Sequence, residues 1–169
     1  MDWNRALTPL PVQKSTNPMS TSVTLSNYLV LPLFNFLGEM NLVGKESRTR
    51  TRFIKMILDR AKEIEQERLD LLKKHAAKDA DGKTIYFDKD KQETTDESIA
   101  QNIKIGNSEG FAKEYNELLG EKFIIDVMDS SKETLNGIKE ILLNTDSSFK
   151  GNDAAIYDEI CTAFETLSE

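Results

Sequence analysis

A long run of apolar residues at helical spacing, beginning near Lys45, constrains the fold of this chain more than any other feature. The intervals of three, four and seven residues keep these side chains on one face of a helix. The pattern predicts one amphipathic helix of about thirty residues, ending near Ala76–Lys78. Because such a helix is longer than a small core requires, self-association of the chain is a further expectation. The residues of the stripe are Phe53, Ile54, Ile57, Leu58, Ala61, Ile64, Leu71 and Leu72.

Shorter patterns on both sides of this helix predict further helices and a small β element. Pro32 is expected to interrupt the first helix, and Asp81-Gly82 is a turn signal between the long helix and a strand. Residues 88–97 are polar and are expected to form a surface loop. The predicted fold is a helix-dominated α+β domain. The expected helices are 26–40, 108–119, 131–144 and 153–167, and the expected strands are 22–25, 84–87, 103–105 and 123–127.

The chain length and the proline distribution predict one domain with a leader. A chain of 169 residues suits a single core, which we assign to 21–169. Residues 1–20 contain Pro9, Pro11 and Pro18 without a hydrophobic period, so we expect an extended, flexible leader there. Met19 lies just before the first patterned segment, so either Met1 or Met19 is a candidate natural start.

The composition indicates a protein of the cytoplasm rather than a secreted or membrane protein. Cys161 is the only cysteine, which excludes an intrachain disulfide framework and a multi-cysteine metal site. No basic segment followed by an apolar one marks a secretory signal. The longest apolar run, Tyr28–Leu37, is too short to cross a bilayer.

Charge is distributed very unevenly along the chain. Between Lys45 and Lys62 there are seven lysines or arginines and two acids, a balance of +5. The whole chain carries −7, so the remainder carries −12. A partner could recognise this polarity electrostatically.

The cations at the start of the long helix are the candidate partner-binding residues. At helical spacing Arg48, Arg52 and Lys55 share one side, Arg50 points elsewhere, and Lys45 precedes them. Cations at a helix N-terminus oppose the macrodipole, so a purely structural helix start would favour acids there. The alternative is a solvated helix start, or cations paired with acids of the same chain.

Two apparent ligand motifs fail on spacing. A phosphate loop needs a glycine five positions before Gly44-Lys45 and a hydroxyl residue after the lysine, whereas Gly38 is one position too far and Glu46 follows. The segment 79–82 resembles the middle of a calcium loop, but Ala77 occupies the first ligand position. A turn explains Asp81-Gly82 fully.

No catalytic constellation is present in the sequence. His75 is the only histidine and has no nucleophile near it in sequence, while Cys161 lies at an inward helical position where a small apolar residue is typical. We therefore expect no enzyme, no cofactor and no metal.

The segment around the cations resembles a small protein family of phages and prophages of Gram-positive bacteria. The resemblance is carried by Asn35-Phe36-Leu37, Leu42, Gly44-Lys45, Ser47-Arg48, Arg50-Thr51 and Phe53-Ile54, continues through the Lys78–Lys83 turn and Glu114–Leu118, and covers roughly residues 23–167. The family has no assigned activity and no assigned catalytic residues. The resemblance implies a phage-encoded accessory protein, in the host cytoplasm or associated with the virion.

Three functions follow from these observations. The leading hypothesis is a non-enzymatic phage accessory protein that binds a phage or host protein, with the tail module or virion assembly as its setting. The second is nucleic-acid binding by Lys45, Arg48, Arg50, Arg52 and Lys55, although no aromatic residue other than Phe53 lies among these cations. The third is inhibition of a host enzyme by acidic helices that imitate a polyanion.

Overall fold

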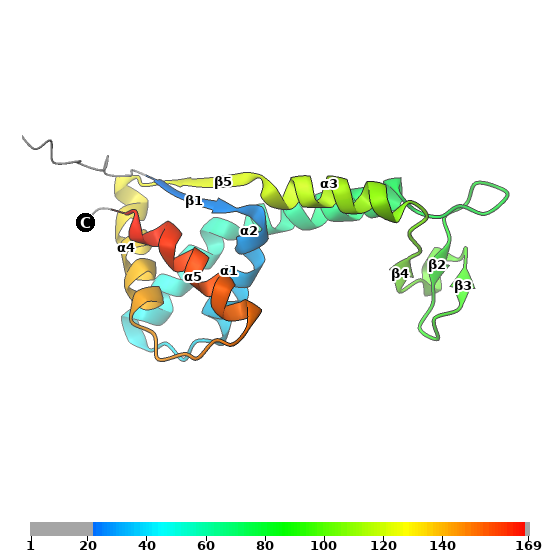
Figure 1. The fold of residues 1–169 in the computed structure, drawn as a ribbon. Helices are drawn as coiled ribbons and strands as arrows, with labels where there is room; N and C mark the ends of the chain where they lie inside the picture. The colour runs from blue at the N-terminus through cyan, green and yellow to red at the C-terminus, as the bar shows by residue number, and fades with distance from the viewer. Residues whose placement is uncertain (1–21, 168–169) are drawn as a thin grey trace, which may run out of the picture.

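The structure is a computed structural model that describes residues 22–167; the predicted leader and the two candidate start methionines lie outside these residues. It is a helix-dominated α+β fold, as the sequence predicts (Figure 1). A helical body at one end continues into a long arm at the other. The helices are α1 (Asn27–Glu39), α2 (Gly44–Lys74), α3 (Ser108–Gly120), α4 (Asp129–Leu143) and α5 (Asn152–Glu165), with a short 3-10 turn η1 (Glu97–Ile99).

The body is closed by a two-stranded antiparallel ribbon of β1 (Ser22–Ser26) and β5 (Lys122–Asp126). Val23 pairs with Ile125 and Leu25 with Phe123, so alternate side chains of both strands face the core. Thr24 and Ile124, which pair with each other, are exposed. The two strands are about one hundred residues apart in sequence, so the ribbon joins the segment that precedes α1 to the segment that precedes α4.

The core of the body is apolar and lies where α1, α4 and α5 surround the first half of α2. Phe53 of α2 packs edge-on against Phe164 of α5, with ring centroids 5.8 Å apart, and both side chains are fully buried. Ile57 continues the same face of α2, as the periodicity predicts. The other members of the core with no measurable exposure are Val23, Val30, Leu33, Leu37, Leu135, Ile138, Leu142 and Ile160.

Pro32 lies inside α1 and does not interrupt the helix, contrary to the sequence prediction. A proline within a helix removes one backbone donor and disfavours the preceding turn. The helix continues because Leu29, Leu33, Phe36 and Leu37 are all buried in the core on both sides of the proline. Tertiary burial here outweighs the local preference.

The arm consists of the second half of α2, with α3 packed alongside it, and a small sheet at its tip (Figure 1). The tip sheet has the order β3-β2-β4, with β2 (Tyr86–Phe87), β3 (Glu93–Thr94) and β4 (Asn102–Ile103). β3 lies within 88–97, where the sequence predicts only a loop. The expected strand 103–105 is divided, because Ile105 forms an isolated bridge with Ala76 instead.

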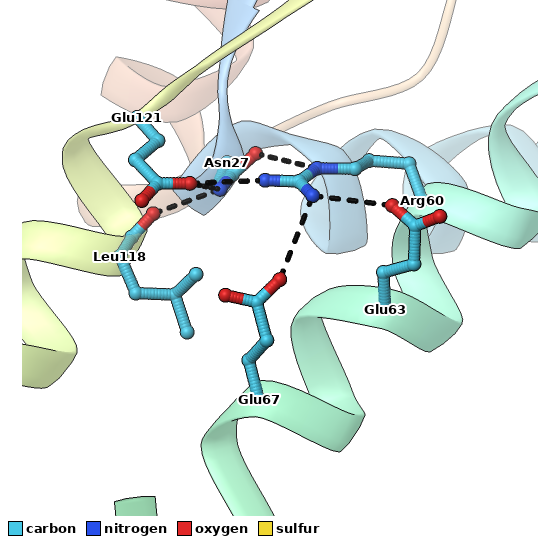
Figure 2. A network of polar contacts seen from close by, with 6 residues as sticks. All are labelled: Asn27, Arg60, Glu63, Glu67, Leu118 and Glu121. Carbon is cyan, nitrogen blue, oxygen red and sulfur yellow. Dashed lines mark hydrogen bonds and ion pairs between the residues drawn. The ribbon is translucent and has the colours of Figure 1, made fainter.

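A polar network fixes the root of the arm to the body (Figure 2). Arg60 of α2 donates from Nε to Asn27 Oδ1 over 3.1 Å and from Nη2 to Glu121 Oε2 over 3.2 Å. Asn27 Nδ2 in turn donates to the carbonyl oxygen of Leu118 over 2.8 Å. These contacts join the start of α1, the middle of α2 and the end of α3. Glu63 and Glu67 of α2 form ion pairs with Nη1 of the same guanidinium group.

None of the helices within residues 22–167 combines the length and the apolar character that a bilayer crossing requires.

Candidate functional site

The first turn of α2 is an uncapped helix start. Gly44 has φ +54°, a left-handed conformation that glycine adopts without steric cost, and it lets the chain turn into the helix. The preceding residue, Val43, is extended and provides no side-chain hydrogen bond to the helix. Glu46 is the only acid in the first turn. The first backbone N–H groups therefore have no side-chain cap, and Glu46 alone offsets the positive end of the macrodipole.

Arg50 is engaged by its own molecule. Its Nη1 donates to the carbonyl oxygens of Leu37 and Met40, over 3.0 Å and 2.9 Å. These carbonyls belong to the end of α1 and the connection that follows it, so Arg50 caps α1 from the neighbouring helix. The structure thus separates Arg50 from the other predicted partner-binding residues.

Lys45 is paired, but weakly. Its Nζ lies 3.4 Å from Oε1 of Glu133 on α4, and the two side chains are 83% and 71% exposed. An ion pair this open to water contributes little and can be exchanged for another partner.

Arg48, Arg52 and Lys55 are all exposed on α2. Within the part of the chain that the structure describes, none of the three makes an ion pair or a side-chain hydrogen bond. The buried stripe of α2, with Phe53 and Ile57, faces the opposite way into the core. The helix therefore holds three uncompensated cations in water.

Arg48 and Arg52, together with Lys45, border a groove between the start of α2 and α4, which we call the cationic groove. Its volume is about 510 Å³. Lys45, Arg48 and Arg52 contribute positive charge, and Glu133 contributes the one negative charge. The lining residues are Gly44, Lys45, Arg48, Thr49, Arg52 and Glu133.

The inner wall of the cationic groove is Thr49, which the sequence analysis did not single out. It is only 7% exposed and packs against Gly137 of α4. A Cβ at position 137 would lie 2.8 Å from the Thr49 methyl group, so only glycine allows the two helices to approach this closely. Neither Thr49 nor Glu133 has a sequence signal of its own, because each gains its role only through the α2–α4 contact.

A second groove, on the other side of the first turn of α2, is acidic. It has a volume of about 520 Å³ and is lined by four carboxylates together with polar and apolar residues. Within residues 22–167 none of these carboxylates forms an ion pair. The start of α2 therefore separates two grooves of opposite charge. The four acids are Glu39, Glu46, Glu140 and Asp146.

The single histidine is buried at the junction of α2 and the tip. His75 is 8% exposed, and its ring meets that of Phe111 edge-on. Its Nε2 lies 3.2 Å from Glu114 Oε1, close enough for an ion pair, but the atoms are not aligned for a hydrogen bond. Lys74, which donates to the same carboxylate, holds the pKa of Glu114 below its usual value.

The other candidates of the sequence analysis, Cys161 and the turn at 79–82, lie in surroundings that favour a structural role. Burial raises the pKa of the Cys161 thiol, which disfavours the reactive thiolate. The Asp79 carboxylate accepts hydrogen bonds from the backbone N–H groups of Asp81 and Lys83, as a turn requires. In residues 22–167 no three histidine, cysteine, aspartate or glutamate side chains gather as a metal site would require.

No family model matches the chain, and no curated protein or solved structure was found to match it. The resemblance to the phage family therefore stays a prediction.

Proposed function

We propose that this protein is a non-enzymatic interaction protein that binds an acidic partner protein through the exposed cations of α2. One observation carries the proposal: Arg48, Arg52 and Lys55 lie together on a rigid helix, and within residues 22–167 none of them forms an ion pair. Arginine on a helix is well suited to paired recognition of carboxylates, because its fork of donors is planar and always charged.

The surroundings of the cations favour a protein partner. Val43, immediately before α2, is 78% exposed and offers an apolar contact beside the charges. Protein interfaces combine such apolar contacts with arginine anchors. The resemblance noted in the sequence suggests a phage or host protein as the partner, in an infected cell.

Nucleic acid is the alternative, and the geometry supports it less. Residues 45–55 span only about 15 Å of helix, which is room for few phosphates on one strand. Among the residues that the structure describes, none of the exposed large apolar side chains is aromatic, so bases have no stacking platform beside the cations. The adjacent acidic groove would also repel a polyanion that runs past the helix start.

The decisive experiment is partner capture from infected host cells with two charge-reversed variants. Arg48→Glu/Arg52→Glu removes two of the cations, and it is expected to fold, because both side chains are exposed and glutamate is a good helix former. Lys73→Glu/Lys113→Glu changes the net charge equally at exposed positions of the arm. Any captured protein is then purified and titrated against the three forms.

We expect one acidic protein that binds the wild-type chain and the arm variant alike, and binds the Arg48→Glu/Arg52→Glu variant at least roughly tenfold more weakly, as desolvated charge pairs imply. Equal binding to all three forms would refute the proposal. So would binding of duplex DNA at low salt that disappears only in the α2 variant, because this result assigns the cations to nucleic acid.

A further inference from the structure

We propose that the cationic groove binds a phosphate group, and that the acidic partner is anchored there by a phosphorylated serine or threonine. The inference rests on the proposed function for its biological meaning, but the binding of phosphate can be tested on the isolated chain.

The first argument is the charge of the groove. Lys45, Arg48 and Arg52 carry three positive charges and Glu133 carries one negative charge, which leaves +2. A phosphomonoester carries about −1.5 to −2 at neutral pH, close to what this lining can compensate. A single carboxylate would leave at least one of these cations unpaired.

The second argument is the hydroxyl group of Thr49. This residue is 93% buried, being 7% exposed, and it lines the groove. Among residues 22–167 its hydroxyl has no hydrogen-bond partner, whereas the hydroxyl of the nearby Thr51 donates to the carbonyl oxygen of Ser47 over 2.9 Å. The Thr49 oxygen is not one of the fully buried side-chain atoms without a partner, so the hydroxyl can be reached from the groove. A phosphate oxygen in the groove would accept this hydrogen bond.

The third argument is the uncapped start of α2 at the mouth of the same groove. Gly44 lines the groove, and no side chain caps the first turn. Free backbone N–H groups and the positive end of a helix dipole favour a bound anion at this position. Two guanidinium groups, one hydroxyl group and a helix start thus surround a single volume.

The size of the groove indicates that the phosphate belongs to a larger ligand. A volume of about 510 Å³ exceeds what an inorganic phosphate ion occupies, and it leaves room for the residues on both sides of a phosphorylated side chain. Glu133 at the rim and Glu46 next to the groove would repel the further phosphates of a nucleic acid. A single phosphomonoester on a peptide fits this distribution of charge.

The test is calorimetric titration of the full chain with four probes. They are inorganic phosphate, a serine-phosphorylated peptide, the same peptide without phosphate, and a single-stranded oligonucleotide. We expect the phosphopeptide to bind most tightly, inorganic phosphate to compete with it, and the unmodified peptide to bind at least roughly tenfold more weakly, as the loss of charge-assisted hydrogen bonds implies.

Three substitutions probe the geometry of the groove. Thr49→Val removes the hydroxyl but keeps the methyl group that packs on Gly137, and Arg48→Gln removes one guanidinium; each should weaken phosphopeptide binding roughly tenfold. Glu133→Gln removes the opposing charge and releases Lys45, so it should tighten binding a few-fold. Lys113→Gln, an exposed position on α3, is the control and should change nothing.

The inference is overturned if phosphate and phosphopeptide do not bind the wild-type chain, if the oligonucleotide binds more tightly than the phosphopeptide, or if Thr49→Val and Glu133→Gln leave affinity unchanged. Failure here together with capture of an unphosphorylated acidic partner through Arg48 and Arg52 would leave the proposed function intact. Phosphate binding without arginine-dependent capture would instead refute the proposed function alone.

Discussion

The body and the arm of this molecule are stabilised in different ways. In the body, side chains from every helix and from the β1–β5 ribbon meet in one apolar core. Between residues 58 and 117, by contrast, His75 is the only buried residue. Two packed helices cannot enclose the apolar residues that they carry, so Leu69, Leu72 and Tyr115 remain half-buried. The cationic groove lies on the body, where the helices that form it are held rigidly.

This difference has a consequence for function. A binding site is more precise when its residues lie on well-packed elements, and Thr49 is fixed by the contact with Gly137. The arm keeps its shape through hydrogen bonds at its root and its tip, such as those from the N–H groups of Gly106 and Asn107 to the carbonyl oxygen of His75. We therefore expect the arm to open locally at a lower free energy than the body.

The largest expected effect is the loss of a core aromatic ring. Phe53→Ala should lower the free energy of unfolding by about 3–5 kcal/mol, because it removes a fully buried ring and leaves a cavity beside Phe164. Leu72→Ala in the arm should cost about 1 kcal/mol, since this side chain is only half-buried. Urea unfolding followed by circular dichroism measures both. Equal costs would mean that the arm has a core of its own.

The next largest loss of stability is expected for the polar network at the root of the arm, compared with an ion pair within the arm. Arg60→Met keeps the aliphatic stem but leaves the Asn27 amide oxygen without its partner in a residue that is 2% exposed. The expected loss of stability is about 1–3 kcal/mol. Arg68→Met breaks the Arg68–Glu65 pair on the surface of α2 and should cost less than about 1 kcal/mol. The comparison fails if the Arg68 variant is the less stable of the two.

The next comparison uses two glycines that lie within helices. Gly137→Ala places a methyl group 2.8 Å from Thr49 and should cost about 1–3 kcal/mol, because neither helix can move away from the core. Gly120→Ala, at the end of α3, meets nothing within 4 Å and should be neutral or stabilising by up to about 1 kcal/mol. Thermal unfolding of both variants tests this. A stabilised Gly137→Ala chain would contradict the close α2–α4 contact.

The smallest effect is a dependence on pH in the arm. Lys74 lowers the pKa of Glu114, so the carboxylate contributes stability above the ordinary glutamate pKa and loses it as pH falls through the lowered folded value. Glu114→Gln should therefore unfold at a slightly lower temperature than the wild type at neutral pH, and the two should converge in acid. A difference that persists at pH 2 would show that the contribution is not ionic.

Much of the fold could be predicted from local patterns. The long helix, Gly44–Lys74, begins where expected and ends two residues before the expected end at 76–78, because the apolar stripe and the turn at Asp81-Gly82 are local signals. The tip sheet was predicted less well. Its strands are only two residues long, and both residues of β3 are polar, so pairing rather than composition defines β3.

The candidate site could be predicted only in part. Arg48, Arg52 and Lys55 lie together and exposed, as helical spacing requires. The capping role of Arg50 depends on the carbonyls of Leu37 and Met40, whose position depends on how α1 ends and packs against α2. Thr49 could not be predicted as a site residue, because a threonine within a helix gives no local indication of the helix that packs against it.

The sequence by itself determined that a rigid helix begins with a cluster of cations and carries an internal apolar stripe, since periodicity and charge are properties of adjacent residues. Only the tertiary structure decided which cations remain unpaired and what lies between them. That outcome depends on Glu133 and Gly137 of α4, which are more than eighty residues away in the chain and reach α2 only through the packing of the core.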